Sequence, residues 1–126
     1  MKIALYIAFH NKSSIDCCKD IIGLISVKNK LVIDSKIKND LSDEDQKKFS
    51  FFDSKKPIEN DFNFVFAIGG DGTILRSITY VKDSNIPVLG INTGRLGFLT
   101  SIQKENIQEA ISLIVNNNLA LLKELF

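Results

Sequence analysis

Apolar residues along the chain alternate between short continuous runs and stretches with helical spacing. The continuous runs predict strands over residues 3–9, 31–33, 62–68 and 87–91. Apolar positions three and four residues apart predict helices over 13–27, 72–82 and 104–115. Strands that alternate with helices through short connections indicate an α/β fold, with an open, mostly parallel sheet flanked by helices. In such sheets, ligands bind at the carboxyl ends of the strands.

The two faces of the predicted elements follow from the same pattern. Both faces of the first run, Ile3 to Phe9, are mostly apolar, as expected of a central parallel strand covered on two sides. For the helix over 72–82, the apolar positions predict the following inner face: Ile74, Leu75, Ile78 and Val81.

Residues 34–61 form a segment of different character, in which charged and polar residues dominate. Ser42, followed by three acidic residues, predicts a helix start, because acids favour the first turn of a helix. Three aromatic residues also lie in this variable polar segment: Phe49, Phe51 and Phe52. They are expected either to pack on the edge of the core or to face a partner subunit.

Length, charge and cysteine content indicate a single domain and give no sign of a nucleic-acid or membrane partner. The chain has 126 residues, the size of one domain, and 16 basic residues nearly balance 15 acidic ones. No electrostatic signature of a nucleic-acid or membrane partner follows from this balance. The only cysteines, Cys17 and Cys18, are neighbours in a predicted helix, which favours a reducing cytoplasm. The apolar run at the N-terminus is too short for a signal peptide or a membrane span.

The segment from Phe64 to Arg76 carries the strongest chemical signal. Five apolar residues are followed by the turn Gly69-Gly70-Asp71-Gly72-Thr73, and an amphipathic stretch then begins. A buried strand, a glycine turn and a helix start together form an anion site, because backbone N–H groups point at the ligand. Asp71 would not help a site that only holds phosphate. Its carboxylate suits a site that also deprotonates or orients a hydroxyl group.

The commoner phosphate loops do not match this turn. There is no Lys-Ser/Thr pair after the last glycine, as in a Walker loop, and no G-x-G-x-x-G dinucleotide fingerprint. The pentapeptide 69–73 after an apolar strand instead resembles the signature shared by NAD kinases, diacylglycerol kinases and 6-phosphofructokinases. Residues 87–100, Pro-Val-Leu-Gly-Ile-Asn-Thr-Gly-Arg-Leu-Gly-Phe-Leu-Thr, are similar to the NAD kinase pattern. Lipid kinases usually carry a different segment there, and a lipid kinase catalytic domain remains the less favoured alternative.

The resemblance to NAD kinases implies a reaction: transfer of the γ-phosphoryl group of ATP to the adenosine ribose 2′-hydroxyl of NAD, giving NADP. Asp71 matches the aspartate taken as proton acceptor for that hydroxyl, and the alternative is that it caps the following helix. Gly70, Gly72 and Thr73 match a turn that contacts the nucleotide through its backbone. Mg²⁺ or another divalent cation would arrive with ATP rather than on protein ligands.

Two further residues match ligand contacts in the resemblance. Arg76 could reach a phosphate or could be a solvated helix arginine, and Phe98 could lie against the adenine or pack in the core. Arg95 is interpreted as a loop cation. His10, after the first strand, is interpreted as structural or solvated. No metal site built from protein ligands is predicted.

NAD kinases are about twice this long, and a β-rich second domain completes their active site. We therefore expect residues 1–126 to be the N-terminal α/β nucleotide-binding domain alone, and the isolated chain to have little or no kinase activity. The alternative is a non-catalytic nucleotide-binding or assembly module left by truncation. By resemblance, the full-length form would be a homo-oligomer that binds NAD and ATP.

Overall fold

The computed structural model describes residues 1–25, 29–93, 102–103 and 106–115. The strands are β1 (Lys2–Tyr6), β2 (Lys30–Asp34), β3 (Ser50–Phe52), β4 (Phe64–Gly69), β5 (Val88–Asn92) and β6 (Ile102–Gln103). The helices are α1 (Lys12–Leu24), α2 (Asp43–Lys48), α3 (Asp71–Val81) and α4 (Ile107–Val115), with 3₁₀ helices η1 (Ser35–Asp40) and η2 (Lys82–Ser84).

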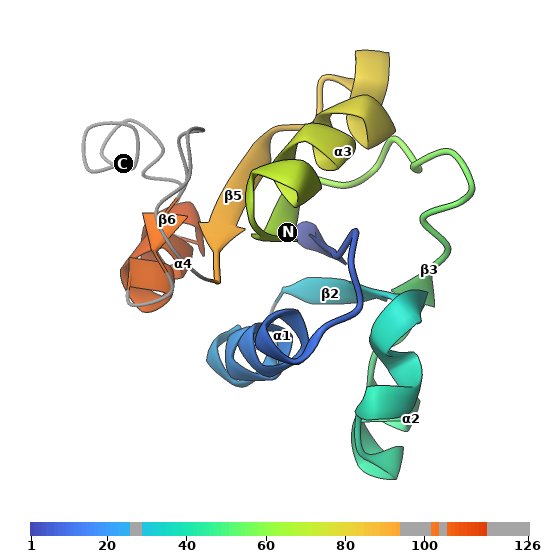
Figure 1. Ribbon diagram of the computed structural model, residues 1–126, viewed down its shortest axis with the longest axis vertical. Helices are drawn as coiled ribbons and strands as arrows, with labels where there is room; N and C mark the ends of the chain where they lie inside the picture. The colour runs from blue at the N-terminus through green and yellow to red at the C-terminus, as the bar shows by residue number, and fades with distance from the viewer. Residues whose placement is uncertain (26–28, 94–101, 104–105, 116–126) are drawn as a thin grey trace.

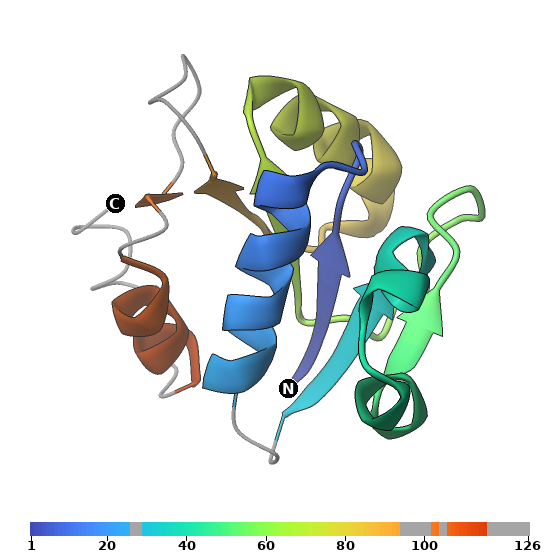
Figure 2. The same ribbon diagram turned by 60° about the horizontal axis from the view of Figure 1, so that its bottom comes forward.

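Within this described part, the strands form one parallel sheet in the order β3-β2-β1-β4-β5-β6. The helices α1 and α4 lie on one side of it and α3 on the other, as Figures 1 and 2 show from two directions. The predicted α/β class, an open parallel sheet flanked by helices, is confirmed. No described helix is both long enough and apolar enough to cross a membrane.

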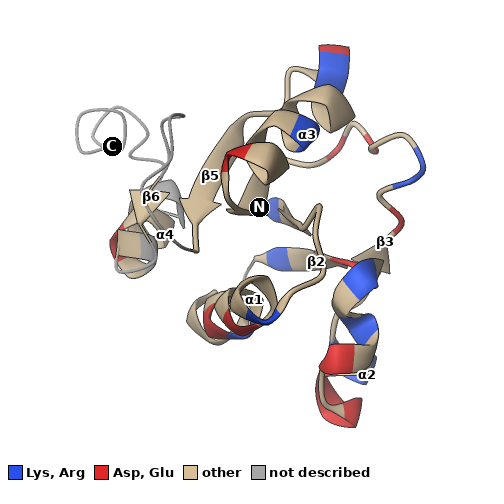
Figure 3. Cartoon of the chain, viewed as in Figure 1, with Lys and Arg blue, Asp and Glu red and all other residues tan. Residues whose placement is uncertain are grey.

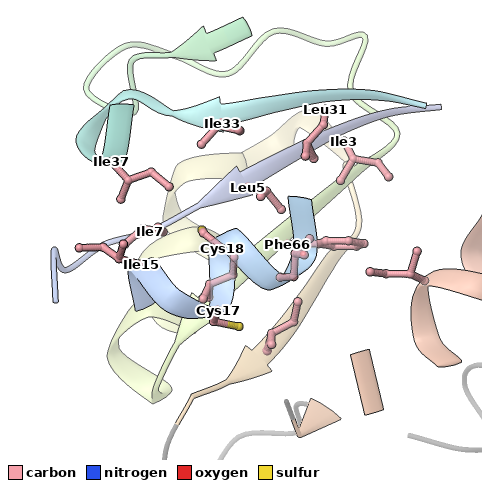
Figure 4. Packing of buried hydrophobic residues seen from close by; sticks show 14 of the residues in the cluster. Ile3, Leu5, Ile7, Ile15, Cys17, Cys18, Leu31, Ile33, Ile37 and Phe66 are labelled. Atoms are coloured by element: carbon pink, nitrogen blue, oxygen red, sulfur yellow. The ribbon is translucent and has the colours of Figure 1, made fainter. Parts of the chain in front are cut away.

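The two faces of the sheet bury separate apolar clusters. Beneath α1 and α4, the larger cluster contains Leu5, Phe66 and both cysteines (Figure 4). Beneath α3, the smaller cluster contains Tyr6, Val65 and Ile74, among others. Both faces of β1 and β4 are therefore buried, as their apolar runs predict for central strands.

The helices α1 and α2 each begin directly after a residue whose side chain caps the first turn. The Asn11 side chain accepts a hydrogen bond from Ser14 N at the start of α1, and Ser42 does the same for Asp45 N at the start of α2. The predicted helix start at Ser42 is thus confirmed. The variable polar segment is more ordered than its composition suggests, because it holds η1, α2 and β3. Its aromatic residues pack partly buried on the core edge, with Phe49 and Phe51 on one cluster and Phe52 on the other.

Two predictions about faces are wrong. In α3, Ile74 and Val81 are buried as expected, but Leu75 and Ile78 are 55% and 53% exposed. Thr73 and Ser77 take their places on the inner face. In the first run the strand ends at Tyr6, so Phe9 lies in the following loop and is 48% exposed instead of continuing the buried face.

Candidate functional site

The glycine turn lies where the order of the strands reverses. β1 lies between β2 and β4 in the sheet. The connection that leaves β1 leads to β2 on one side, and the connection that leaves β4 leads to β5 on the other side, so the two diverge at the carboxyl ends of β1 and β4. This divergence leaves a crevice at the edge of a parallel sheet, the usual place for a ligand. Gly69 is the last residue of β4 and is in register with Asn92 at the end of β5. Residues 88–92, which belong to the segment 87–100 that resembles the NAD kinase pattern, therefore lie beside the glycine turn.

Gly69 is the glycine that the backbone itself requires. Its φ of +149° lies in a region that residues with side chains rarely adopt. A Cβ atom here would lie 2.9 Å from Thr73 Cβ and would also clash with Thr73 Oγ1. The Gly69 carbonyl accepts a hydrogen bond from Thr93 N at 3.3 Å, which ties the turn to the end of β5. Sequence reasoning did not include Gly69 among the site residues, although the cluster of glycines was its visible signal.

Gly70 and Asp71 form the start of α3. Gly70 occupies the N-cap position, and its carbonyl accepts hydrogen bonds from Thr73 N and Ile74 N at 3.1 and 3.2 Å. A Cβ atom at Gly70 would meet nothing within 4 Å. Asp71 is half-buried in the first turn of the helix, one residue past the N-cap. Its carboxylate is thus at the positive end of the helix dipole, which stabilises negative charge.

Phe9 covers the other side of the turn. A Cβ atom at Gly72 would lie 3.3 Å from Phe9 Cε2, so this ring packs directly on the glycine. The Arg76 guanidinium lies over the same ring, 5.0 Å from its centroid. Sequence reasoning missed Phe9 as a site residue, because its apolar character fitted a buried strand equally well.

Asp34 and Lys36 hold the loop that carries Phe9. The Asp34 side chain is fully buried at the end of β2 and accepts hydrogen bonds from Ile7 N at 3.2 Å and Lys36 N at 3.0 Å. Lys36 Nζ donates to Asp34 Oδ2 at 3.3 Å and to the Ile7 carbonyl at 3.0 Å. The backbone of Ile7, two residues before Phe9, is therefore fixed from both sides. No sequence motif signals this pair.

The predicted site residues fall into two groups. Gly70, Asp71, Gly72, Thr73 and Arg76 come together at the start of α3, beside the ends of β1 and β5. Thr73 is buried against Gly69, so its side chain supports the turn.

The remaining candidates lie elsewhere. Phe98 and Arg95 lie outside the described residues. His10 pairs with Asp40, Nε2 to Oδ2 at 2.7 Å, which agrees with a structural interpretation. In the described part of the chain, no three His, Cys, Asp or Glu side chains are grouped so that they could hold a metal ion.

Comparisons with known proteins identify the family of the chain. The family described as "ATP-NAD kinase N-terminal domain" matches residues 24–119. The chain is 40% identical over 121 residues to the NAD kinase of Flavobacterium johnsoniae, covering 94% of this chain and 41% of that protein. It is 37% identical over 127 residues to the NAD kinase of Christiangramia forsetii, covering 96% of this chain and 42% of that protein.

A solved structure shows the same fold. The crystal structure of yeast NADH kinase complexed with NADH matches with a TM-score of 0.70 at 15% identity, covering 92% of this chain and 36% of that one. The chain thus spans about two fifths of the length of the curated relatives that it matches. On the family match over residues 24–119, this chain belongs to the ATP-NAD kinase N-terminal domain family.

Proposed function

We propose that this chain supplies the N-terminal half of an active site that transfers the γ-phosphoryl group of ATP to the adenosine ribose 2′-hydroxyl of NAD. The observation that carries the proposal is the place of Asp71. Its carboxylate stands in the first turn of α3, directly after β4, at the crevice where the strand order reverses. A general base in that position accepts the proton of a hydroxyl group while neighbouring backbone amides bind phosphate.

The backbone around Asp71 is suited to an anionic substrate. Phosphoryl transfer depends mainly on positioning and charge stabilisation, so N–H groups at a helix start contribute directly. On the grounds of family resemblance, we assign the nucleotide contacts to the backbone of Gly70, Gly72 and Thr73, at the start of α3. Gly70 leaves open space in front of this turn, which allows a nucleotide to approach the backbone closely.

Arg76 is the cation proposed to neutralise a substrate phosphate. It is exposed, and its guanidinium lies over Phe9 rather than in a salt bridge that the structure records. Mg²⁺ or another divalent cation is assigned to the phosphates of ATP, whose oxygens suit such a cation. Phe98 is retained as the proposed adenine contact on the grounds of family resemblance.

The test is reconstitution. The chain is fused to the remaining C-terminal part of the F. johnsoniae NAD kinase, and NADP is measured with an NADP-specific dehydrogenase. We expect the fusion to form NADP and the 126-residue chain alone to form little. Asp71→Asn in the fusion should lower kcat by about 10²–10⁴-fold, the usual contribution of a positioned base.

Each result has a defined meaning. An Asp71→Asn fusion with unchanged kcat would contradict the role of Asp71 as base. A folded fusion that binds NAD and ATP without forming NADP would instead support a non-catalytic nucleotide-binding module. Calorimetric titration of the same proteins with NAD and with ATP–Mg²⁺ separates loss of binding from loss of chemistry.

Two wider properties remain part of this proposal. A cytoplasmic location is supported by Cys17 and Cys18, which are buried and not joined in a disulfide. Homo-oligomerisation of the full-length form is proposed from the family resemblance, and size-exclusion chromatography of the fusion tests it.

A further inference from the structure

The connection from β3 to β4 leaves part of the sheet without a helical cover. α1 joins β1 to β2 and α3 joins β4 to β5, but residues 53–63 cross back over the sheet without forming a helix. Figure 1 shows this connection passing beside α3. Aromatic rings fill the space beneath, with Tyr6 stacked on Tyr80 at 5.2 Å and Phe52 stacked on Tyr80 at 6.1 Å between centroids.

A cavity of about 640 Å³ remains between α3 and this connection. That volume is within the range of pockets that hold small-molecule ligands, roughly 300–1,000 Å³. Its long wall is the outer side of α3 together with η2, and its opposite wall is the segment around Pro57. None of the residues from Gly69 to Thr73 lines it, so it is separate from the glycine turn, and Arg76 stands between the two.

The charged side chains that line the cavity are mostly positive. Lys55 and Lys56 line it from the connection, and Arg76 and Lys82 line it from α3 and η2. Figure 3 shows basic positions on both of these segments. The single carboxylate among the lining residues is Asp83. Cations that converge from two walls favour a phosphorylated or otherwise strongly anionic ligand.

The remaining lining is uncharged and includes both polar residues, such as Asn60 and Thr79, and apolar ones. Pro57 and Ile58 stand on one wall, with Tyr6 and Tyr80 at the back. Burial, followed by the nearby negative charges of Asp34, Asp53 and Glu59, raises the pKa of Tyr80 to about 12. Its hydroxyl, like that of any tyrosine, is neutral at physiological pH. A planar or apolar group can therefore pack here while a phosphate reaches the lysines.

We propose that this cavity is a second ligand site, which takes a phosphorylated small molecule of nucleoside monophosphate size. The phosphate binds between Lys56 and Lys82, from opposite walls, and the nucleoside packs against Pro57 and Tyr80. The site is distinct from the glycine turn and does not depend on the role of Asp71 as general base. Because Arg76 borders both regions, a ligand here would alter the position of the guanidinium beside the turn.

The test uses the 126-residue chain with AMP as the probe. Tyr6 and Tyr80 are the only two tyrosines of the chain, and both line this cavity, so ring signals from ¹³C-labelled tyrosine report on it. Tyr80 also lines the neighbouring pocket beside Phe52, so the Tyr6 signal distinguishes the two. Affinity is measured by calorimetry for AMP and for inorganic phosphate. The pocket variant is Lys56→Gln with Lys82→Gln, and the control is Lys19→Gln with Lys47→Gln, which removes the same charge from exposed positions on α1 and α2.

We expect AMP to shift both tyrosine signals and to bind at least about tenfold more weakly to the pocket variant than to the control, since each lost contact is charge-assisted. The tyrosine shifts separate binding in this cavity from binding at the proposed active site, because Tyr6 and Tyr80 line the cavity and the glycine turn does not. Equal binding to both lysine variants, or tyrosine signals that do not move, would overturn the proposal. AMP that binds no more tightly than inorganic phosphate would overturn the assignment of a nucleoside ligand. Circular dichroism confirms that both variants are folded.

Discussion

The guanidinium of Arg76 lies over the ring of Phe9, 5.0 Å from the ring centroid, and the same ring packs on Gly72. This contact joins the loop after β1 to the first two turns of α3, two segments that are far apart in the sequence. It also gives Arg76 a defined direction beside the glycine turn without using the charge of a carboxylate. The geometry of the proposed phosphate site therefore depends on an aromatic residue from the loop after β1.

Replacing Phe9 tests this dependence. In the fusion protein, Phe9→Ala should raise the KM for substrate by a fewfold, because an exposed cation–π contact contributes only about 0.5–1 kcal/mol. Phe9→Leu keeps apolar cover on Gly72 but removes the π face, and it is expected to show the same KM change with less loss of stability. Steady-state kinetics and urea unfolding measure the two effects. A wild-type KM in both variants would show that Phe9 does not position Arg76.

The two neighbouring glycines of the turn should respond differently to alanine. Gly69→Ala is expected to lower the free energy of unfolding by about 2–3 kcal/mol, because it forces a side chain into a φ of +149° and against Thr73. Gly70→Ala should change it by less than about 0.5 kcal/mol, since the position is open. In the fusion, Gly70→Ala should nevertheless weaken nucleotide binding. Equal loss of stability in the two variants, measured by urea unfolding, would contradict this assignment.

The buried carboxylate of Asp34 should depend on Lys36. The Lys36 side chain is 32% exposed, so Lys36→Met is expected to cost about 2 kcal/mol, less than the loss of a fully buried partner. Lys12→Met is the matched control, because Lys12 pairs with Asp16 while 89% exposed, and such pairs contribute under about 0.5 kcal/mol. Chemical denaturation compares the two. A Lys36 variant as stable as the control would mean that the backbone amides alone satisfy Asp34.

Tyr80 gives the stability a predictable dependence on alkaline pH. Burial raises its pKa from 10.0 to about 12 in the folded chain. Above pH 10 the unfolded chain therefore loses this proton first, so the stabilisation is complete below pH 10 and is lost as pH rises towards 12. Tyr80→Phe should show a shallower fall in unfolding free energy between about pH 9 and pH 11.5 than the wild type. Parallel curves for the two proteins would exclude a raised pKa of Tyr80 in the folded chain.

The order and type of the main elements could be predicted from the sequence because apolar runs and glycines mark them directly. β3 could not, since three residues within a polar segment carry no reliable period. The inner face of α3 was misassigned for a physical reason. Ser77 is buried because its hydroxyl donates to the Ile74 carbonyl at 2.6 Å, so a polar residue occupies a position expected to be apolar.

In the candidate site, residues that are close in sequence could be predicted, and residues that come from distant parts of the chain could not. The turn at residues 70–73 and Arg76 are close in sequence, so a motif brings them to attention together. Phe9 and the pair Asp34–Lys36 come from the ends of other strands, and only the parallel register of β1, β2 and β4 brings them to the turn. The sequence likewise does not show at which position of the turn glycine is required, because that depends on the φ angle of each residue.

The two cysteine thiols of α1 can be used to measure how often the larger core cluster opens. Cys17 and Cys18 are both 0% exposed and lie against the sheet in Figure 4. Burial raises the pKa of the Cys18 thiol well above its ordinary value, which further suppresses the reactive thiolate. Alkylation can then proceed only through molecules in which this helix has moved away from the sheet. The labelling rate of the native chain, divided by that of the unfolded chain, gives the population of that open form without any denaturant.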